Sequence, residues 1–328
     1  MSRLLEVRDL SVGIEKDEKL YRAVNNISFT IEEGEIVGLS GESGCGKSMT
    51  ALSIPNLLPQ AAKITGGEII YNGVSLTSLS EKELNAIRGR DISVVFQETR
   101  QSLNPLMRSG RQITEMLELT GETDKEKNKI HVLETLSSLG FEDPHKIFDA
   151  YPHQLSGGMC QRVMTAIASI SRPRLLLADE PSSSLDKESQ ERILSYLIKM
   201  NRDFNTAVLV ISHDLSIIRR FASRFIVMYA GRIVEEGRTS ALFSPLHPYT
   251  RALTGAIPAK DKRGKKLENI GGKVPSIQDS FSGCPFAPRC PKAQSICTET
   301  FPPVTEMDDK HVNGRVNCFF PHTGDGND

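Results

Sequence analysis

The chain has almost no net charge and no long hydrophobic run. Its 328 residues carry a formal net charge of −1, so no overall electrostatic attraction to nucleic acid is expected. The longest apolar runs lie at 175–178, 207–211 and 225–230 and are strand-sized, well below the roughly 18 to 20 residues that cross a bilayer. Residues 1–6 lack the apolar region of a signal peptide. These absences predict a cytosolic chain that reaches a membrane only through a partner.

Cysteine is scarce, but most of it is concentrated in one region. The chain has six cysteines, and four of them lie near the C-terminal end: Cys284, Cys290, Cys297 and Cys318. In a reducing cytosol a disulfide framework is not expected, so this group indicates a metal site. The intervening segments of five, six and twenty residues are long for structural zinc. Iron–sulfur clusters accept four thiolates at varied spacings, while zinc and unliganded buried thiols are the alternatives.

Turn signals and apolar runs indicate an α/β arrangement. Residues 1–95 are predicted to form short strands with turns, including a hairpin at Asn72-Gly73, because a type I′ turn needs positive φ at both central residues. The continuous apolar runs named above predict strands of a sheet covered on both faces. A second hairpin is expected around Gly231-Arg232.

The middle of the chain, from about 100 to 155, has a helical pattern. An amphipathic core helix that ends near Gly140 is predicted from apolar residues at every third position, namely Ile130, Leu133, Leu136 and Leu139, with Val132 adding to the apolar stripe. Residues 260–266 form a charged stretch that predicts a solvated linker, with a lipid-facing basic patch as the weaker alternative. A tail rich in proline, cysteine and glycine follows this linker.

A glycine-rich stretch follows the apolar run 36–39. Residues 41–48 match G-x-x-x-x-G-K-[ST], the P-loop pattern, and its glycines let backbone amides approach phosphate groups. A helix is expected directly after it. Lys47 is expected to neutralise the β- and γ-phosphates, and the Ser48 hydroxyl to bind Mg²⁺. The predicted nucleotide-binding residues of this stretch are Gly41, Glu42, Ser43, Gly44, Cys45, Gly46, Lys47, Ser48 and Met49.

Two adjacent carboxylates follow a second apolar strand. Asp179 and Glu180 come directly after the run 175–178, and ligand sites of open α/β sheets lie at the carboxyl ends of strands. Asp179 is expected to hold Mg²⁺, and Glu180 to polarise the attacking water. A helix cap or a surface carboxylate pair is the alternative, but it explains the position at the end of an apolar strand less well.

Further motifs follow the P-loop in a fixed order. They are Gln97 after the apolar run 94–96, Leu-Ser-Gly-Gly-Met at 155–159, Asp179-Glu180, the stretch 183–186 and His213 after the run 208–211. This order resembles the nucleotide-binding subunit of an ATP-binding cassette (ABC) transporter. The resemblance covers roughly residues 4–257.

The resemblance implies roles for these residues. Gln97 would sense Mg²⁺ and the attacking water and contact the permease, and His213 would hold the γ-phosphate. Glu180, His213 and Gln97 are therefore the expected catalytic residues, while Ser48, Gln97 and Asp179 are the expected Mg²⁺ ligands. Asp186 would lie across a dimer interface. The residues expected to contact the γ-phosphate bound by an opposite subunit are Ser156, Gly157 and Gly158.

Three segments resemble the oligopeptide, dipeptide and nickel importer branch of this family. They are the region 97–105, the Pro-Leu-His-Pro-Tyr-Thr stretch at 245–250 and the cysteine segment 283–291. For the group of Cys284, Cys290, Cys297 and Cys318, this branch implies a [4Fe–4S] cluster with a structural or regulatory role.

Three positions depart from the branch pattern. Cys160 stands where the branch usually has arginine, and a surface contact near the signature is expected to be weaker. Residues 98–101 replace a run that usually contains Asp-Pro, so permease contact is less expected there. Ile14 occupies about the position of the aromatic residue that stacks on adenine, which leaves Tyr21 as the nearest candidate.

The resemblance implies an ATPase subunit that powers import of oligopeptides or dipeptides, or of a related solute such as nickel. It implies ATP and Mg²⁺ as ligands, and a location on the cytoplasmic face of the membrane. The expected partners are two integral permease subunits, a second ABC ATPase and, indirectly, an extracytoplasmic solute-binding protein. The alternative is a non-transport ABC ATPase, such as one serving iron–sulfur assembly, although the stretch 245–250 argues against it.

The implied fold class is α/β. It comprises a RecA-like P-loop core, an antiparallel β subdomain, a helical signature subdomain and a small cysteine-rich C-terminal domain. The expected domains are a nucleotide-binding domain at 1–257, with its helical subdomain at about 98–157, and a cluster-binding extension at 258–328.

Overall fold

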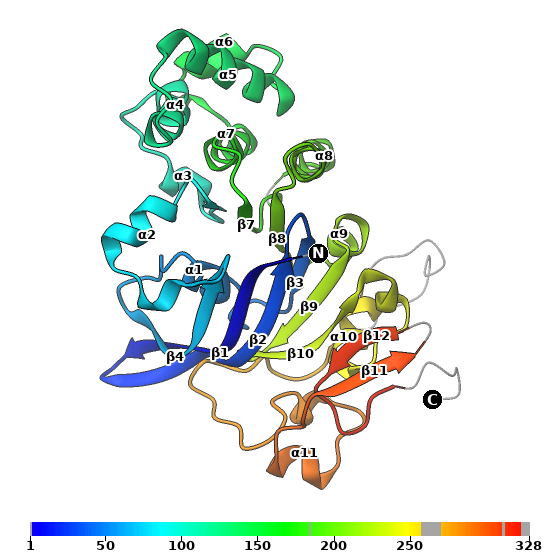
Figure 1. Ribbon diagram of the computed structural model, residues 1–328. Coiled ribbons are helices and arrows are strands. Elements are labelled where there is room, and N and C mark those ends of the chain that lie inside the picture. Colours follow the sequence, from blue (N-terminus) through cyan, green and yellow to red (C-terminus); the bar gives the residue numbers. More distant parts are fainter. Residues whose placement is uncertain (1, 184, 257–269, 310–311, 323–328) are drawn as a thin grey trace. The chain divides into compact units, whose positions relative to one another are not determined.

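The computed structural model describes residues 2–183, 185–256, 270–309 and 312–322. The chain divides into two compact units (Figure 1). The first unit joins residues 1–4, 31–36 and 78–211, and the second joins 5–30, 37–77 and 212–328. Ser184 and the expected linker at 260–266 lie outside the described residues.

The first unit contains a parallel sheet. Its strands are β6 (Ile92–Val95), β7 (Leu175–Asp179) and β8 (Ala207–Ile211), and every residue in them is buried. The apolar runs at 175–178 and 207–211 therefore form the predicted strands, since both of their faces are covered. The helix α7 (Gly157–Ser169) contacts β6, and α8 (Lys187–Phe204) contacts β8.

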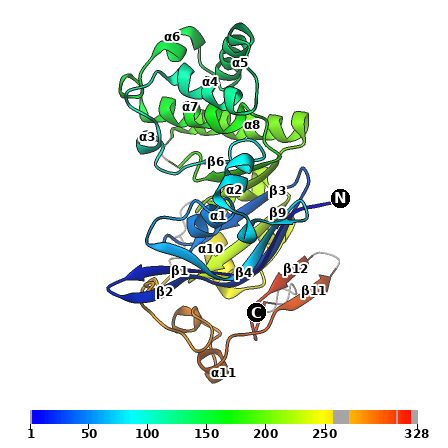
Figure 2. The ribbon, with the colours of Figure 1, turned by 60° about the vertical axis from the view of Figure 1, so that its left-hand side comes forward.

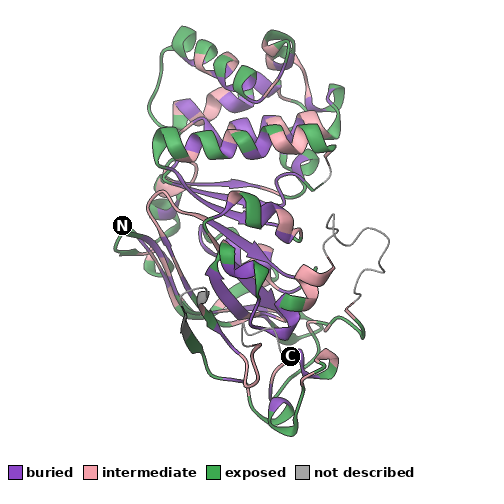
Figure 3. Cartoon of the chain, turned by 90° about the vertical axis from the view of Figure 1, so that its right-hand side faces the viewer, coloured by how far each residue is buried: buried purple, intermediate pink, exposed green. Residues whose placement is uncertain are grey.

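Several shorter helices make up most of the remaining first unit. They are α2 (Glu81–Ile87), α3 (Thr99–Ser102), α4 (Ser109–Leu119), α5 (Lys125–Ser138) and α6 (Pro144–Asp149). Helices α4, α5 and α6 pack on one another and, with α7, enclose a common apolar core (Figure 2). Figure 3 shows that these helices present both buried and exposed faces.

The predicted helix in this unit forms, but part of its core face was predicted wrongly. Gly140 has φ 78° just after α5, as expected of a helix end. Val132, Leu136 and Leu139 are fully buried, whereas Ile130 is 56% exposed. The buried row follows the i, i+4, i+7 spacing of a helix face, so strict three-residue spacing included a residue on the solvent side.

The second unit contains an antiparallel sheet. Its order is β2 (Lys19–Glu32), β1 (Arg3–Lys16), β4 (Ala62–Tyr71) and β5 (Val74–Ser75). The hairpin between β4 and β5 is confirmed, with φ 48° at Asn72 and 80° at Gly73. Strands β1 and β2 have 14 residues each, so the prediction of only short strands in 1–95 was wrong.

A second set of paired strands belongs to the same unit. Strand β3 (Ile36–Ser40) is parallel to β9 (Arg224–Tyr229), which forms the expected hairpin with β10 (Arg232–Arg238). Along its other edge, β10 pairs with β12 (Val312–Val316), which in turn pairs with β11 (Thr305–Asp309). The helices of this unit are α1 (Lys47–Ser53), α9 (Leu215–Phe221), α10 (Pro248–Gly255) and α11 (Ser295–Glu299).

Short 3₁₀ turns occur in both units. They are Leu76–Ser78, Pro152–Gln154, Thr239–Phe243 and Ala287–Arg289. Among the described residues, no helix is both long and apolar enough to cross a membrane.

Strand β10 buries a carboxylate. Glu235 is 1% exposed, and its two carboxylate oxygens accept hydrogen bonds from the backbone N–H groups of Leu246 and His247, both at 2.9 Å. Burial nevertheless raises the pKa of Glu235 from 4.5 to about 6. Because the folded state binds this proton more tightly, its contribution to stability is complete below about pH 4.5 and is lost as pH rises through about 6.

We expect Glu235→Gln to remove this pH dependence. Between about pH 5 and about pH 7, the wild-type chain should lose about 1 kcal/mol more unfolding free energy than the variant. Urea unfolding at the two pH values measures this difference. Burial lowers the pKa of His247 to about 3, but His247 is present in both chains and cancels in the comparison. An equal pH response of the two chains would contradict the assignment.

Candidate functional site

The loop between β3 and α1 has the backbone that its glycines predict. Gly41, Gly44 and Gly46 have φ angles of 151°, 80° and 102°, in the region that favours glycine. The Lys47 side chain folds back along this loop, where Nζ donates hydrogen bonds to the carbonyl oxygens of Gly41 at 2.8 Å and Glu42 at 3.0 Å. Lys47 is only 7% exposed. The loop thus holds one buried ammonium group beside its own backbone.

The other predicted residues of the loop surround this lysine. Ser43 and Gly44 are exposed, Cys45 is buried, and Ser48 and Met49 are half-buried in the first turn of α1. Helix α1 begins at Lys47, as expected from the sequence. The backbone N–H of Gly231, in the β9–β10 turn, donates to the carbonyl oxygen of Cys45 at 3.0 Å. The loop is therefore tied to a neighbouring strand pair.

Gly41 provides a test of this loop geometry. A methyl group at Gly41 would press against the backbone carbonyl oxygen of Met228 and lie 2.6 Å from the Sγ of Cys45. We expect Gly41→Ala to abolish nucleotide binding and to destabilise the fold by about 2 kcal/mol more than Gly73→Ala. Gly73 also has positive φ, but a methyl group there meets nothing within 4 Å.

Thermal unfolding and MgADP titration of the two glycine variants measure these effects. The control change at Gly73 should cost only the left-handed strain of about 1 to 2 kcal/mol. Equal destabilisation by both substitutions, with nucleotide binding retained in Gly41→Ala, would contradict the steric explanation.

A cavity of about 440 Å³ lies beside the loop within the second unit. Gly44 and Tyr21 both line it, together with residues 275–281 from the C-terminal region. Ile14 pairs with Ala62 in the antiparallel sheet and is not among the described residues that line this cavity. Tyr21, rather than Ile14, therefore shares a cavity with the phosphate-binding loop.

Three predicted residues of the first unit follow adjacent parallel strands. Gln97 lies beyond the end of β6, while Asp179 ends β7 and Glu180 follows it. Asp179 is 5% exposed and Glu180 is 9% exposed. Glu180 has φ 48°, and its N–H donates to the carbonyl oxygen of Ile211 at 3.1 Å. A strained backbone at the carboxyl edge of a parallel sheet is typical of a functional residue.

The signature stretch begins helix α7. Ser156 is the N-cap, and its Oγ accepts a hydrogen bond from the N–H of Met159 at 3.2 Å. Ser156 and Gly157 are exposed, Gly158 is half-buried, and a methyl group at Gly157 would meet nothing within 4 Å. This helix start is therefore accessible to another molecule.

Cys160, the residue after the signature stretch, lies in the interior of the first unit. Its side chain is 0% exposed, and its Sγ lies 3.6 Å from the carbonyl oxygen of Pro152. Helix α7 turns this position toward the apolar core, and the weaker surface contact expected from the missing arginine stays a prediction. A buried cysteine of this kind packs as a small apolar residue.

Asp186 and His213 occupy the positions that the motif order predicts. Asp186 caps α8, where its Oδ1 and Oδ2 accept hydrogen bonds from the N–H and Oγ of Ser189 at 2.9 and 2.8 Å. These bonds lower the pKa of Asp186. His213 belongs to the second unit and is exposed between β8 and α9. The functional roles of both residues stay predictions.

The four C-terminal cysteines line one small cavity in the second unit. Cys284, Cys290, Cys297 and Cys318 share this cavity of about 20 Å³ with aromatic and proline side chains. Burial raises the pKa values of Cys284 and Cys290, and raises that of Cys318 to about 11. Within the part of the chain that the structure describes, no three His, Cys, Asp or Glu side chains are arranged to hold a metal ion. The structure brings the thiols together but does not confirm a metal site.

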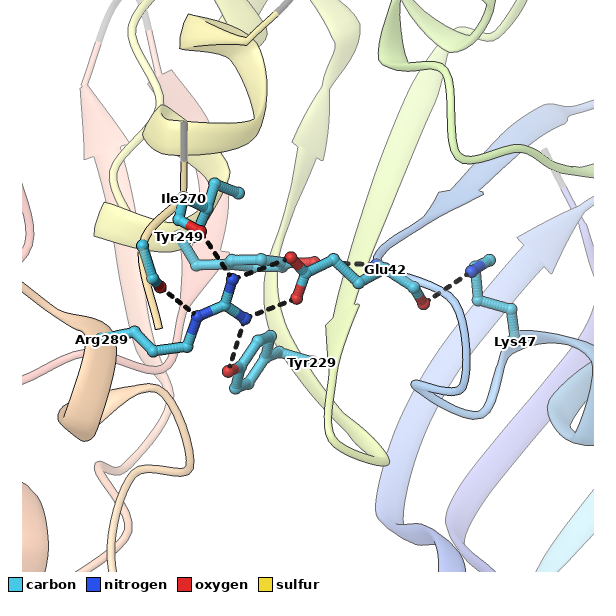
Figure 4. A network of polar contacts seen from close by, with 7 residues as sticks. Glu42, Lys47, Tyr229, Tyr249, Ile270 and Arg289 are labelled. Atoms are coloured by element: carbon cyan, nitrogen blue, oxygen red, sulfur yellow. Dashed lines mark hydrogen bonds and ion pairs between the residues drawn. The ribbon is translucent and has the colours of Figure 1, made fainter. Parts of the chain in front are cut away.

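The sequence did not reveal two residues that hold the phosphate-binding loop through polar contacts with Glu42 (Figure 4). The N–H of Glu42 donates to the hydroxyl oxygen of Tyr249 at 2.8 Å, and the Glu42 carboxylate pairs with Arg289 at 2.7 Å. Tyr249 and Arg289 are 207 and 247 positions away from Glu42 along the chain. No local pattern could reveal contacts over such separations, although both residues lie in segments that resemble the importer branch.

A glycine loop that holds a lysine, a carboxylate edge and an accessible signature helix together define an ATP-binding cassette. The structure is similar to the solved dimer of the ATP-binding cassette MJ0796 bound to ADP and Pi. The TM-score is 0.67 and the sequence identity is 30%, and the similarity covers 72% of this chain and 99% of that chain. The profile of the ABC transporter family also matches residues 24–183.

A match in the C-terminal region shows to which branch of the ABC transporter family the chain belongs. Residues 234–297 match the oligopeptide/dipeptide transporter C-terminal region. The chain is 43% identical to a probable peptide ABC transporter ATP-binding protein, y4tR of Sinorhizobium fredii, over 94% of this chain and 93% of that protein. It is 40% identical to the dipeptide transport ATP-binding protein DppD of Bacillus subtilis, over 97% and 95%. The chain belongs to the oligopeptide/dipeptide branch of the ABC transporter ATP-binding proteins and is an ABC-type ATPase.

Proposed function

We propose that this chain binds and hydrolyses ATP to power the import of oligopeptides or dipeptides through a membrane permease. The buried Lys47 in its glycine loop is the observation that carries the nucleotide part of the proposal. The peptide cargo is supported by the C-terminal match and by the names of the full-length relatives. Because both relatives match almost end to end, the similarity includes the cysteine segment as well as the nucleotide motifs.

Within this proposal, the motifs read from the sequence divide the chemistry among them. Residues 41–49 cradle the phosphates, and Tyr21 stacks on the adenine. Mg²⁺, which stabilises charge on phosphoryl oxygens, would be held by Ser48, Gln97 and Asp179. Their hydroxyl, amide and carboxylate oxygens are the hard ligands that this ion prefers.

The remaining residues act on the γ-phosphate. Glu180 accepts the proton of the attacking water, and His213 contacts the γ-phosphate. Residues 156–158 and Asp186 serve the nucleotide of a second ATPase subunit, which agrees with the exposure of Ser156 and Gly157. In such a sandwich, closing two subunits around ATP supplies the force that moves the permease.

The proposed assembly contains two integral permease subunits and a second cassette ATPase, with a solute-binding protein acting from outside. The chain would sit peripherally on the cytoplasmic face of the membrane. We retain 1–257 as the proposed nucleotide-binding domain, with a helical subdomain at about 98–157, and 258–328 as the proposed extension.

The proposal includes a [4Fe–4S] cluster on Cys284, Cys290, Cys297 and Cys318, with zinc as the alternative. Four thiols around one cavity are the donor set of such a cluster, and Phe286, Phe319 and Phe320 give the cavity an apolar lining. Side-chain rearrangement is required, because the described residues do not form a ligand group as they stand. ATP-driven import needs no redox step, so the role proposed for a bound cluster is structural. The cluster would cross-link the C-terminal segment.

Isolation of the chain from native membranes tests the assembly. Under anaerobic conditions, we expect two integral permeases and a second cassette ATPase to accompany it. Soluble cluster-assembly proteins with no permease would overturn the transport function.

An uptake assay then tests the cargo. Cells that lack this chain should regain uptake of a radiolabelled dipeptide with the wild-type chain but not with Lys47→Ala. The Lys47→Ala chain should still assemble with the permeases, which shows that transport, rather than assembly, depends on the nucleotide. Restored uptake of Ni²⁺ without peptide uptake would contradict the peptide cargo.

A further inference from the structure

Arg289 makes an unusually complete set of contacts in the second unit. Its Nε donates to the carbonyl oxygen of Gly271 at 2.8 Å, and its Nη2 donates to that of Ile270 at 3.2 Å. Nη1 donates to the hydroxyl of Tyr229 at 3.1 Å, and the two Nη atoms donate to the two carboxylate oxygens of Glu42 at 2.7 and 3.0 Å. A guanidinium has five N–H donors, so all of them are used here.

This guanidinium is also almost completely buried. The side chain of Arg289 is 4% exposed, and that of Glu42 is 19% exposed. The Glu42 carboxylate and the Tyr229 hydroxyl raise the pKa of Arg289 further. A bidentate, buried arginine–carboxylate pair is among the stronger polar contacts in proteins, unlike an exposed ion pair.

Glu42 connects this pair to the lysine of the phosphate-binding loop. Its N–H is held by the hydroxyl of Tyr249, its carboxylate by Arg289, and its carbonyl oxygen accepts a hydrogen bond from Lys47 Nζ (Figure 4). Glu42, which accepts a hydrogen bond from Lys47, is therefore itself held in place by Tyr249 and Arg289 from the C-terminal part of the sequence. A shift of Glu42 would move both the loop backbone and the lysine ammonium.

Charge provides a second reason for the pair. Glu42 places a carboxylate in the loop that must receive negatively charged phosphates. A half-buried carboxylate without its counterion would repel those phosphates, because charges interact more strongly away from bulk water. The guanidinium of Arg289 cancels this charge at the same place.

We infer that Arg289 is a positioning residue for nucleotide binding, which acts through Glu42 to hold the conformation and charge of the phosphate-binding loop. The inference rests on the proposed role of residues 41–49 in binding ATP. It makes a residue between two of the C-terminal cysteines, Cys284 and Cys290, part of the support of the nucleotide site. It requires no metal in the cysteine cavity.

A double-mutant cycle on the full-length chain tests this inference. MgADP is titrated calorimetrically into the wild-type chain, Arg289→Ala, Glu42→Ala and the double variant. In the wild-type background we expect Arg289→Ala to raise the Kd of MgADP about tenfold. In the Glu42→Ala background the same change should alter the Kd by less than about twofold, because the partner through which Arg289 acts is gone.

Two further variants separate positioning from general stability. Arg315→Ala is the matched control, since it removes ion pairs with Glu236 and Glu306 at 3.3 and 3.5 Å in the same C-terminal region without touching the loop. It should lower the Tm without changing the Kd. Arg289→Lys keeps the charge but cannot make the bidentate contact, so its Kd for MgADP should lie between those of the wild-type chain and Arg289→Ala. If Arg289→Ala does not fold, the comparison is made with Arg289→Lys.

The outcomes distinguish the inference from the function on which it rests. If the wild-type chain does not bind MgADP, the proposed nucleotide site is wrong. If the wild-type chain binds and the Arg289 variants bind equally well, Arg289 is only a structural contact and the inference fails. An equal effect of Arg289→Ala with and without Glu42 would also overturn it, because Arg289 would then not act through Glu42.

Discussion

Replacing Glu180 with glutamine is expected to leave nucleotide binding intact and to lower ATP turnover by about 100- to 10,000-fold. Glutamine has the same shape and keeps one acceptor oxygen, but it cannot take a proton from water. Glu180 is 9% exposed, and its backbone N–H is bonded to Ile211. The substitution should therefore remove the proton acceptor without moving the chain around it.

Phosphate release by the assembled transporter measures the turnover, and titration with MgADP measures the binding. Glu188→Gln serves as the control, because Glu188 is a 74% exposed residue of α8 that pairs with Arg192. This control should turn over ATP at the wild-type rate. Normal turnover by Glu180→Gln would remove Glu180 from the catalytic role.

Anaerobically purified chain is expected to be brown and to contain iron and sulfide in stoichiometric amounts, and Cys318→Ala is expected to lose both. Cys318 lines the common cavity with the other three cysteines, so removing it leaves an incomplete ligand set. Its pKa of about 11 means that the metal-free thiol is protonated at neutral pH. Cluster binding must then release protons, which makes iron retention weaker at low pH.

Iron analysis and the visible absorbance spectrum measure this prediction. Cys160→Ala is the matched control, since Cys160 is buried among the helices of the first unit. It should keep its full iron content. Zinc without iron in the wild-type chain would favour the alternative metal, and iron retained by Cys318→Ala would exclude that residue as a ligand.

The strands and turns were predictable because their signals are local. The runs 175–178 and 207–211 became buried strands, since continuous apolar residues need cover on both faces. Asn72-Gly73 became a turn because both residues adopt positive φ at low cost. Helix α5 also formed, but the assignment of Ile130 to its buried face failed, because which row of a helix is buried depends on the neighbouring helices.

Some residues of the candidate site were likewise predictable from local sequence signals, and others were not. Motif spacing located Lys47, Asp179 and Glu180 on the elements that carry them, since each lies at the end of a recognisable strand or the start of a helix. The environment of Cys160 and the pair of Glu42 with Arg289 could not be predicted, because both depend on contacts between segments far apart in the chain. The four C-terminal cysteines were grouped from the sequence, and the folded chain places them around one cavity.

The pairing of β12 with β10 also bears on the solution behaviour of the protein. Strand β12 covers the ladder groups of β10 at Glu235, Glu236 and Gly237. Without that cover, β10 would present an open row of backbone donors and acceptors, which is a template for another chain. The C-terminal hairpin thus moves the open edge of this sheet from β10 to β11, whether or not the cysteines bind a metal.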